Sequence, residues 1–378
     1  MRTKQVFKLT TLALLLTAVV SSCSAPKAAK EDTLKDALQG KFFIGAAVNV
    51  DQMAGKDSLA IEVVKKNFSS IVAENCMKME NIHPVKGEFF FDEADAYVEF
   101  GEKNNMKIIG HTLIWHSQAA KWAFVDDEGK DVSREELIER MRNHIHTIVG
   151  RYKGRVHGWD VVNEAILDNG EWRQSKWYTI IGPEFVQLAF EFAHEADPNA
   201  ELYYNDYNEW IPAKRDGIYN MVKDLIDKGV KVDGIGLQGH IALDSPSIEL
   251  YEEAIVKYAS LGVQTMVTEL DITVLPWPSQ QVTADISFSA ELSTEYNPFV
   301  NGLPDSVSVE LTNRFASFFE LFLKHQDKID RVTLWGVHDG QSWKNNWPIR
   351  GRKDYPLLFD RQYQSKPAVQ RIIELAKQ

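Results

Sequence analysis

The sequence predicts an α/β protein built as a single (β/α)8 TIM barrel. From Phe42 onward, short apolar runs alternate with longer amphipathic stretches, which is the pattern of a parallel sheet with crossover helices. Eight apolar runs of strand length can be identified, and eight strands close this kind of barrel. The sequence contains no internal repeat and no linker of the kind that separates domains. We therefore expect one folded domain.

Each expected strand is followed by an amphipathic stretch of helical length. The expected strands are residues 42–47, 69–73, 107–112, 156–162, 201–205, 234–238, 264–269 and 332–336. The expected helices are residues 58–67, 94–104, 134–150, 184–196, 214–228, 248–260, 312–326 and 366–376.

Local signals support several of these boundaries. Ser133 precedes an acidic pair and is a suitable N-cap for the helix that follows. Gly150, Gly229 and Gly262 fall at or just after the ends of expected helices, where glycine is common. The segment 276–308 is rich in proline, serine and threonine, so we expect a long loop after the seventh strand.

The N-terminus has the features of a targeting segment. Arg2, Lys4 and Lys8 precede the apolar run 9–20, which is too short to favour a membrane span. Small residues and Cys23 follow this run. We expect three parts, namely a lipoprotein-type signal peptide at 1–22, a tether at 23–36 and the folded domain at 37–378.

The residues from Val20 to Cys23 resemble a bacterial lipoprotein signal box, in which the cysteine becomes the lipidated first residue of the mature chain. The alternative is an ordinary signal peptide with an incidental cysteine. In the lipoprotein reading only Cys76 remains in the folded domain, and a single cysteine cannot form an internal disulfide.

Composition excludes some classes of partner. The formal net charge of −12 argues against nucleic-acid binding, which needs clustered lysine and arginine. Aromatic residues make up 11% of the chain and include 10 tryptophans, whose faces stack on sugar rings as readily as they fill a core. A neutral or weakly charged partner fits this balance better than an anionic polymer.

Polar residues terminate several of the expected strands, at the end of the barrel where active sites lie. Glu164 follows the fourth strand and Glu269 ends the seventh. Taken singly, each has an ordinary interpretation as a solvated carboxylate at a strand end. Together they match the pair that cleavage of a glycosidic bond requires, one proton donor and one nucleophile or base. Sequence leaves open whether their separation is the ~5–5.5 Å of retaining enzymes or the ~6.5–9.5 Å of inverting ones.

The histidines do not predict a metal site. His111 and His116 lack cysteine or carboxylate residues at ligand spacing beside them. His144 and His146 are two positions apart on an expected helix and do not share a face. Glycine-rich phosphate-binding signals are also missing. We expect a reaction that needs neither metal nor cofactor.

Several motifs together resemble glycoside hydrolase family 10, the endo-β-1,4-xylanases. The resemblance covers essentially everything after the tether, in the family's order. It rests on the segments 73–78, 110–118, 159–165, 204–208, 238–240, 268–271 and 335–337, with Asp339, Ser342 and Trp343. The implied fold is a single (β/α)8 barrel and the implied chemistry is retaining.

The resemblance also implies roles for individual residues. Glu164 is implied as the general acid/base and Glu269 as the nucleophile. Their supporting residues are implied to be Asn163, which binds the sugar 2-hydroxyl, Asn205 near the acid/base, and the pair His240 and Asp271, which orient Glu269.

A larger set is implied to contact substrate. The aromatic floor and wall of the cleft are implied to be Trp335 and Trp343, whose alternative interpretation is packing. The other expected contacts are Glu74, Asn75, Lys78, His111, Trp115, Gln118 and Gln238.

The expected function is hydrolysis of xylan and xylo-oligosaccharides by a monomer. We expect contact with a membrane only through a lipid on Cys23, in a bacterial envelope at the outer membrane or cell surface, or else secretion. One alternative is a β-1,4-glucanase or mixed-linkage enzyme, because one hydroxymethyl group per sugar separates glucose from xylose. The other is a non-catalytic glycan-binding lipoprotein, against which both intact glutamates argue.

Overall fold

The computed structural model describes residues 32–278 and 285–378. The expected signal peptide, Cys23 and most of the expected tether lie outside the described residues. Within the described ranges, no helix has both the length and the apolar character needed to cross a bilayer.

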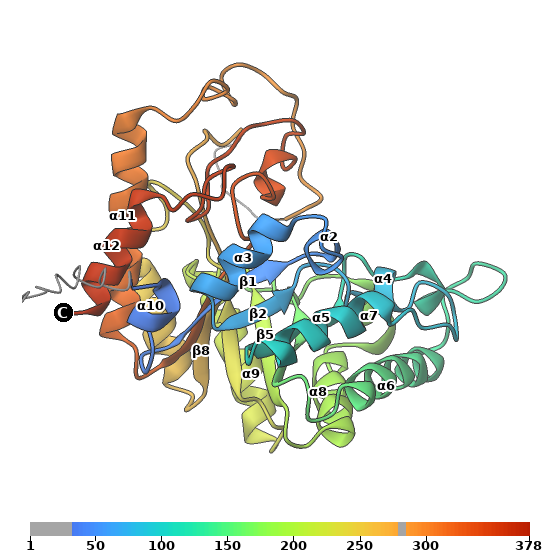
Figure 1. Ribbon diagram of the computed structural model, residues 1–378. Coiled ribbons are helices and arrows are strands. Elements are labelled where there is room, and N and C mark those ends of the chain that lie inside the picture. Colours follow the sequence, from blue (N-terminus) through green and yellow to red (C-terminus); the bar gives the residue numbers. More distant parts are fainter. Residues whose placement is uncertain (1–31, 279–284) are drawn as a thin grey trace, which may run out of the picture. The chain divides into compact units, whose positions relative to one another are not determined.

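Parallel strands form a closed barrel, which confirms the predicted (β/α)8 fold. In the described residues, eight strands pair in the order β1-β2-β3-β4-β5-β6-β8-β9, and β9 returns to β1 (Figure 1). A ninth strand, β7, pairs only with the outer part of β8. The strands are β1 (Phe43–Val48), β2 (Ser70–Ala73), β3 (Lys107–Trp115), β4 (Gly158–Asn163), β5 (Glu201–Asp206), β6 (Gly234–Leu237), β7 (His240–Ala242), β8 (Gln264–Thr273) and β9 (Ile329–Leu334).

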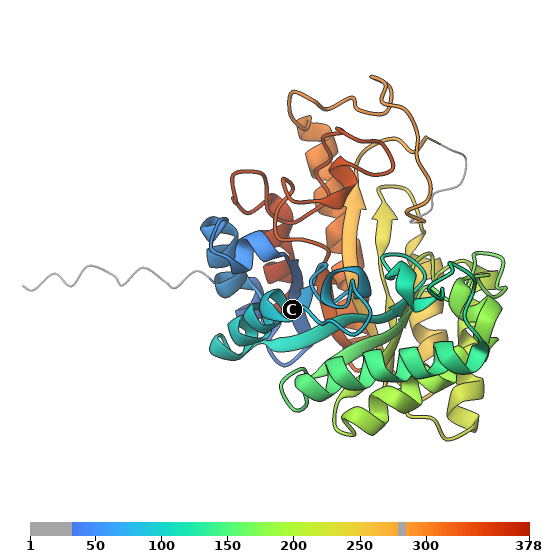
Figure 2. The same ribbon diagram turned by 90° about the vertical axis from the view of Figure 1, so that its right-hand side faces the viewer.

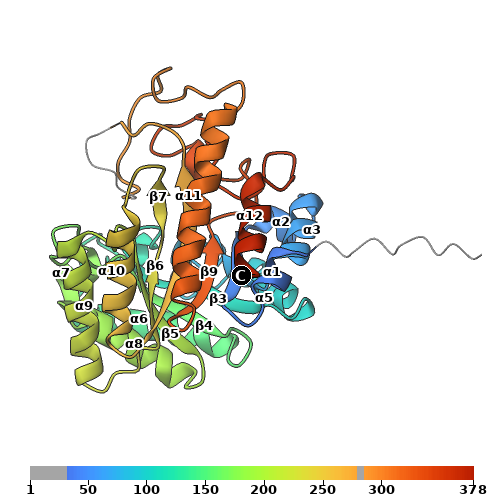
Figure 3. The ribbon, with the colours of Figure 1, turned by 90° about the vertical axis from the view of Figure 1, so that its left-hand side faces the viewer.

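Helices cover the outside of the barrel, and α10, α11 and α12 are seen together on one side of it (Figure 3). The longer helices are α3 (Ser58–Asn67), α5 (Asp92–Lys103), α6 (Arg134–Arg151), α8 (Phe185–Ala196), α9 (Pro212–Asp227), α10 (Ile248–Ala259), α11 (Asp305–Lys324) and α12 (Pro367–Ala376). Shorter ones are α1 (Leu34–Ala37), α2 (Val50–Met53), α4 (Met79–Ile82) and α7 (Lys176–Ile181), with the 3-10 helices η1 (Lys121–Ala123) and η2 (Trp343–Asn345).

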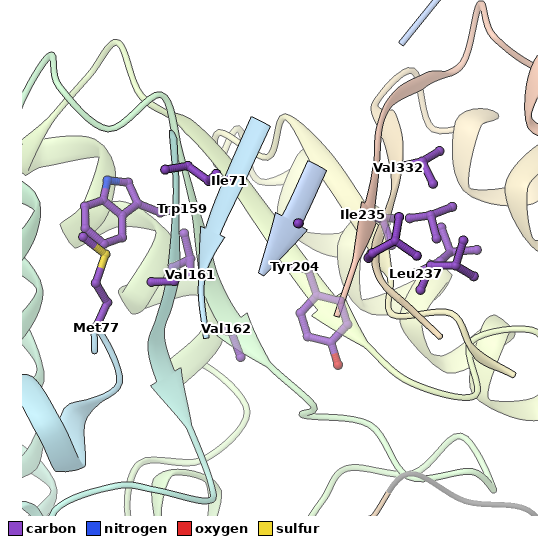
Figure 4. Close-up of a cluster of buried hydrophobic side chains, with 14 of the residues drawn as sticks. Ile71, Met77, Trp159, Val161, Val162, Tyr204, Ile235, Leu237 and Val332 are labelled. Atoms are coloured by element: carbon purple, nitrogen blue, oxygen red, sulfur yellow. The ribbon is translucent and has the colours of Figure 1, made fainter. Parts of the chain in front are cut away.

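The apolar core lies mainly between the strands and the helices. Figure 4 shows part of it, with Trp159, Val161 and Tyr204 among side chains from several strands. Trp159 also explains a glycine in the third strand, because a Cβ at Gly110 would come within 2.1 Å of its ring. Close packing of this kind leaves no room for even one added carbon.

Several expected boundaries were wrong. β3 continues to Trp115 and β8 continues to Thr273, because the outer parts of these strands pair with β4 and with β7. The expected loop 276–308 ends early because α11 begins at Asp305, and residues 279–284 of that loop lie outside the described residues. Pro304 at the N-cap and Asp305 in the first turn are the local signals that mark this start.

The buried His144 packs against a second buried histidine, His83. Its Nδ1 lies 3.1 Å from Nδ1 of His83, and the two rings stack at a centroid distance of 5.3 Å. Burial lowers the pKa of His83 to about 4 and that of His144 to about 3, so both rings are neutral near pH 7. Cys76 is also buried, and burial raises the pKa of its thiol to about 12.

Candidate active site

A cleft of about 150 Å³ lies at the carboxyl ends of the strands. The segments that follow β8 and β9 gather at this end of the barrel (Figure 2). The structure brings together in the cleft both glutamates, Asn163, His240 and every residue expected to contact substrate. The lining consists of Glu74, Asn75, Lys78, His111, Trp115, Gln118, Asn163, Glu164, Gln238, His240, Glu269, Ile286, Trp335 and Trp343.

Glu164 directly follows β4 and is held in an uncommon backbone conformation. Its φ of +60° lies in the left-handed region, which costs a residue with a side chain about 1 kcal/mol or more. Its N–H donates to the Asn205 carbonyl at 2.9 Å, and its own carbonyl accepts from Arg173 Nε at 2.9 Å. These two bonds hold the strained residue in place, so the carboxyl group leaves the strand end at a defined angle.

The Glu164 carboxyl is buried and accepts hydrogen bonds from two amides. Oε1 accepts from Asn163 Nδ2 at 3.1 Å and from Gln238 Nε2 at 3.0 Å. Burial raises the pKa of Glu164, although the Gln238 hydrogen bond and the Arg173 charge partly oppose it. His116 Nδ1 lies 3.8 Å from Oε2, but burial lowers the pKa of that ring to about 4, so it adds no cation near pH 7.

Glu269 lies within β8 and has the opposite electrostatic environment. Its Oε1 accepts from Asn205 Nδ2 at 2.8 Å, and its Oε2 lies 3.2 Å from His240 Nε2. Burial alone would raise the pKa of Glu269. The His240 hydrogen bond and the positive charges of His111, His240 and Lys78 outweigh burial and hold that pKa below its usual value.

His240 connects Glu269 to a second buried carboxylate. The β7–β8 register places His240 opposite Asp271, and its Nδ1 lies 3.0 Å from Asp271 Oδ2. Burial would lower the pKa of His240, but the charge and hydrogen bond of Asp271, with the hydrogen bond to Glu269, raise it to about 9. Trp343 Nε1 donates to the same Asp271 oxygen at 2.7 Å. Asp271 does not line the cleft but lies behind the residues that do.

Asn205, which was expected near the acid/base, contacts both glutamates. Its amide nitrogen donates to Asn163 Oδ1 at 3.0 Å as well as to Glu269, and its oxygen accepts from Thr268 Oγ1 at 2.7 Å. Its backbone carbonyl accepts a hydrogen bond from the N–H of Glu164. The Gln238 side chain, from the end of β6, contacts the Glu164 carboxyl, whereas the Asn205 amide donates to Glu269.

A buried lysine organises one wall of the cleft. Lys78 Nζ donates to Asn75 Oδ1 and Gln118 Oε1, both at 3.0 Å. The same nitrogen lies 4.9 Å from the ring centroid of Trp115 and 5.7 Å from that of Trp335. Burial lowers the pKa of Lys78, and the nearby carboxylates oppose this. The wall therefore offers hydrogen-bond donors beside aromatic faces, which suits a neutral polyhydroxylated ligand.

Some residues of the site were not expected from sequence. Gln341 Nε2 donates to Glu74 Oε2 at 3.1 Å, and Gln52 donates to Gln341 Oε1 at 2.7 Å. Gln341 falls between Asp339 and Ser342 of a recognised motif, which is a signal that could have found it. Ile286 lines the cleft from the segment after β8, and no local pattern marks it.

A larger cavity of about 840 Å³ lies at the opposite end of the barrel, where β3 and β5 begin. Its charged residues neutralise each other, since Lys107 pairs with Glu201 at 2.8 Å and Arg155 pairs with Glu102 at 2.7 Å. Chemistry is better supported in the smaller cleft, where burial and charge shift the pKa values of two carboxyl groups in opposite directions.

Comparisons with known proteins agree with this geometry. The family model for Glycosyl hydrolase family 10 matches residues 33–375. The chain is 49% identical to Endo-1,4-beta-xylanase A of Xylanibacter ruminicola, over 93% of this chain and 95% of that protein. It is 42% identical to an Endo-1,4-beta-xylanase of Geobacillus stearothermophilus, over 91% and 98%. A GH10 endoxylanase structure from a sugarcane soil metagenome superimposes with a TM-score of 0.88 at 45% identity, covering 90% of this chain and 99% of that one. This protein therefore belongs to glycosyl hydrolase family 10.

Proposed function

We propose that this protein is an endo-acting, retaining hydrolase of the β-1,4-xylosidic linkages of xylan and xylo-oligosaccharides. The observation that carries the proposal is the pair of buried carboxyl groups with opposite pKa shifts in one cleft, Glu164 raised and Glu269 lowered. Relatives named Endo-1,4-beta-xylanase support the choice of xylan over other glycans.

The proposed reaction has two displacements. In the first, Glu269 attacks the anomeric carbon while Glu164 gives its proton to the departing glycosidic oxygen, and a covalent glycosyl-enzyme forms. In the second, Glu164, now ionised, takes a proton from water as that water attacks the anomeric carbon and releases Glu269. The first step leaves Glu164 ionised and Glu269 esterified, and the second step returns both groups to their starting charges.

The neighbouring residues have supporting roles in this proposal. His240 and Asp271 keep Glu269 ionised and aimed at the sugar, and Asn205 donates to the other nucleophile oxygen. Asn163 is proposed to bind the sugar 2-hydroxyl between the two glutamates. The proposed substrate contacts are Glu74, Asn75, Lys78, His111, Trp115, Gln118, Gln238, Trp335 and Trp343.

Substrate preference provides the direct test. Reducing-sugar release from xylan is expected to exceed release from carboxymethylcellulose or mixed-linkage β-glucan by at least about tenfold, because a cleft that discriminates one hydroxymethyl group gains ~1–3 kcal/mol. Faster release from either glucan would favour the glucanase alternative. Binding of xylan without cleavage would favour a glycan-binding protein and overturn the proposal.

The pH profile tests the division of roles between the glutamates. Because the Gln238 hydrogen bond lowers the pKa of Glu164, Gln238→Leu is expected to raise that pKa. Glu164 then stays protonated to higher pH, and the alkaline limb of kcat/KM moves upward. The acidic limb, which reports ionisation of Glu269, serves as the internal control and should stay in place. A downward shift of the alkaline limb would contradict the assignment.

We also propose that the catalytic domain, residues 37–378, is held as a monomer on a bacterial envelope by a lipid on Cys23. The basic residues and apolar run of 1–22 support a signal peptide, and 23–36 would be the tether. Palmitate labelling in cells should mark the wild type and not Cys23→Ala. An unlabelled wild type released as soluble product would show that the protein is secreted instead.

A further inference from the structure

Arg173 connects three parts of the active-site rim. Its Nε donates to the backbone carbonyl of Glu164 at 2.9 Å, and one terminal nitrogen donates to the Tyr207 hydroxyl at 2.7 Å. The other terminal nitrogen lies 3.3 Å from Asp285 Oδ2. Its side chain is only 12% exposed, so its interactions are largely shielded from water.

Asp285 belongs to the segment after β8, and its two carboxylate oxygens make separate contacts. Its Oδ2 faces Arg173, whereas its Oδ1 accepts from the N–H of Ser287 at 3.0 Å and from the Ser287 hydroxyl at 2.7 Å. Ile286 lies between these two residues and lines the cleft, although it is 38% exposed. The position of this exposed apolar side chain therefore depends on a short turn that Arg173 holds.

The barrel order shows on which side of the cleft this turn lies. Glu74, Asn75 and Lys78 follow β2, and β6 is opposite β2 in the eight-stranded ring. Arg173 follows β4, and Asp285 follows β8, so their contact spans the rim above β5 and β6. Tyr207, which follows β5, confirms this path because it bonds to Arg173. Ile286 thus faces the cleft from the side opposite the Lys78 wall. This is the half of the rim that carries Glu164, which in the proposed function protonates the leaving group.

We propose that Asp285 is a positioning residue that, through Arg173, fixes the proton donor Glu164 and holds Ile286 against the leaving-group sugars of a xylan chain. This inference rests on the proposed function, in which Glu164 protonates the leaving group. The two effects are linked because one guanidinium binds both the carbonyl of the strained Glu164 and the carboxylate beside Ile286.

The contact between Asp285 and Arg173 should matter most for substrates with poor leaving groups. A poor leaving group, such as a sugar hydroxyl, needs both a well-placed proton and contacts beyond the scissile bond. A 2,4-dinitrophenolate needs no proton and brings no second sugar. Loss of the Asp285 anion should therefore slow cleavage of oligosaccharides and leave cleavage of 2,4-dinitrophenyl β-xylobioside nearly unchanged.

Asp285→Asn is the matched substitution for this test. The amide keeps an oxygen that can accept from Ser287 and removes the negative charge that faces Arg173. Ser287→Ala is the control, because it removes only the hydroxyl hydrogen bond and leaves in place both the backbone N–H bond that closes the turn and the ion pair. Xylohexaose, reducing-end-labelled xylopentaose and the dinitrophenyl glycoside are the substrates, and thermal unfolding monitors the fold of each variant.

We expect Asp285→Asn to lower kcat/KM on xylohexaose by about fivefold to tenfold, within the range that small misplacements produce, with a change below about twofold on the dinitrophenyl glycoside. Cleavage of xylopentaose should shift toward bonds with fewer sugars on the leaving side, and Ile286→Ala should reproduce that shift. Wild-type behaviour of Asp285→Asn, or equal losses on both substrates, would overturn the proposal. The proposal would also be overturned if Ser287→Ala changed the ratio of kcat/KM on xylohexaose to kcat/KM on the dinitrophenyl glycoside as much as Asp285→Asn does.

Glu164→Ala distinguishes a failure of the proposed function from a failure of the positioning role of Asp285. If Glu164→Ala itself shows no selective loss on substrates with poor leaving groups, then the role of Glu164 as proton donor is wrong. If Glu164→Ala shows that selectivity and Asp285→Asn does not, only the positioning role of Asp285 fails.

Discussion

Glu269→Ala is expected to lower kcat/KM on xylan by about four orders of magnitude or more, which is the scale of loss when a nucleophile is removed. The carboxylate is held ionised by His240 and positioned by Asn205, and the substitution removes the oxygen that they hold. Reducing-sugar release from xylan measures the effect. Near wild-type turnover would refute the assignment of the nucleophile.

Azide provides the matched control for Glu269→Ala. A small anion that occupies the space of the missing carboxylate can attack the anomeric carbon of 2,4-dinitrophenyl β-xylobioside from the same face. The product expected is the α-xylobiosyl azide, identified by its anomeric proton coupling. Formation of the β-azide would place Glu269 on the other face of the sugar and exchange the two roles.

Glu164→Ala is expected to lower kcat/KM on xylan by about two to four orders of magnitude, the usual contribution of a general acid. The loss in the first step should be small for 2,4-dinitrophenyl β-xylobioside, because its leaving group needs no proton. Release of dinitrophenolate in a rapid burst, followed by slow turnover, would show that the second step still lacks its base. Stopped-flow absorbance measures both phases.

Azide again separates this variant from a general structural defect. It should accelerate the slow phase of Glu164→Ala and give the β-xylobiosyl azide, since attack on the glycosyl-enzyme comes from the face that Glu164 occupied. The control is Glu80→Ala on α4, because Glu80 is exposed and does not line the cleft. No acceleration by azide would contradict the acid/base role.

Much of the site could be predicted because active-site residues of this fold stand at strand ends. Glu164 and Glu269 follow or terminate recognisable apolar runs, so the topology alone brings them to one opening. The same rule placed His240 and Asp271 correctly at adjoining strands, and the β7–β8 register brings them opposite each other. What a strand-end position does not give is the direction of a side chain; the Asn205 amide, for example, donates to both Asn163 and Glu269.

Contacts between distant segments could not be predicted from local patterns. Ile286 lines the cleft beside Asp285, and Asp285, after β8, contacts Arg173, after β4. Nothing in the composition of 276–308 marks either residue, since the segment has no periodicity that fixes where it lies. Similarly, Gln52 supports Glu74 through Gln341 although almost the whole folded chain separates Gln52 from Gln341.

The sequence by itself determined the barrel, the eight strands that form it, and the pair of glutamates at its mouth, because alternating apolar patterns and strand-end polar residues are local properties. Tertiary structure decided which carboxyl keeps its proton. Both glutamates are buried, and burial alone would raise both pKa values. The hydrogen bond from His240 and the charges of His111, His240 and Lys78 around Glu269 reverse the direction there. These groups come from different strand ends, so they surround Glu269 only when the barrel has closed.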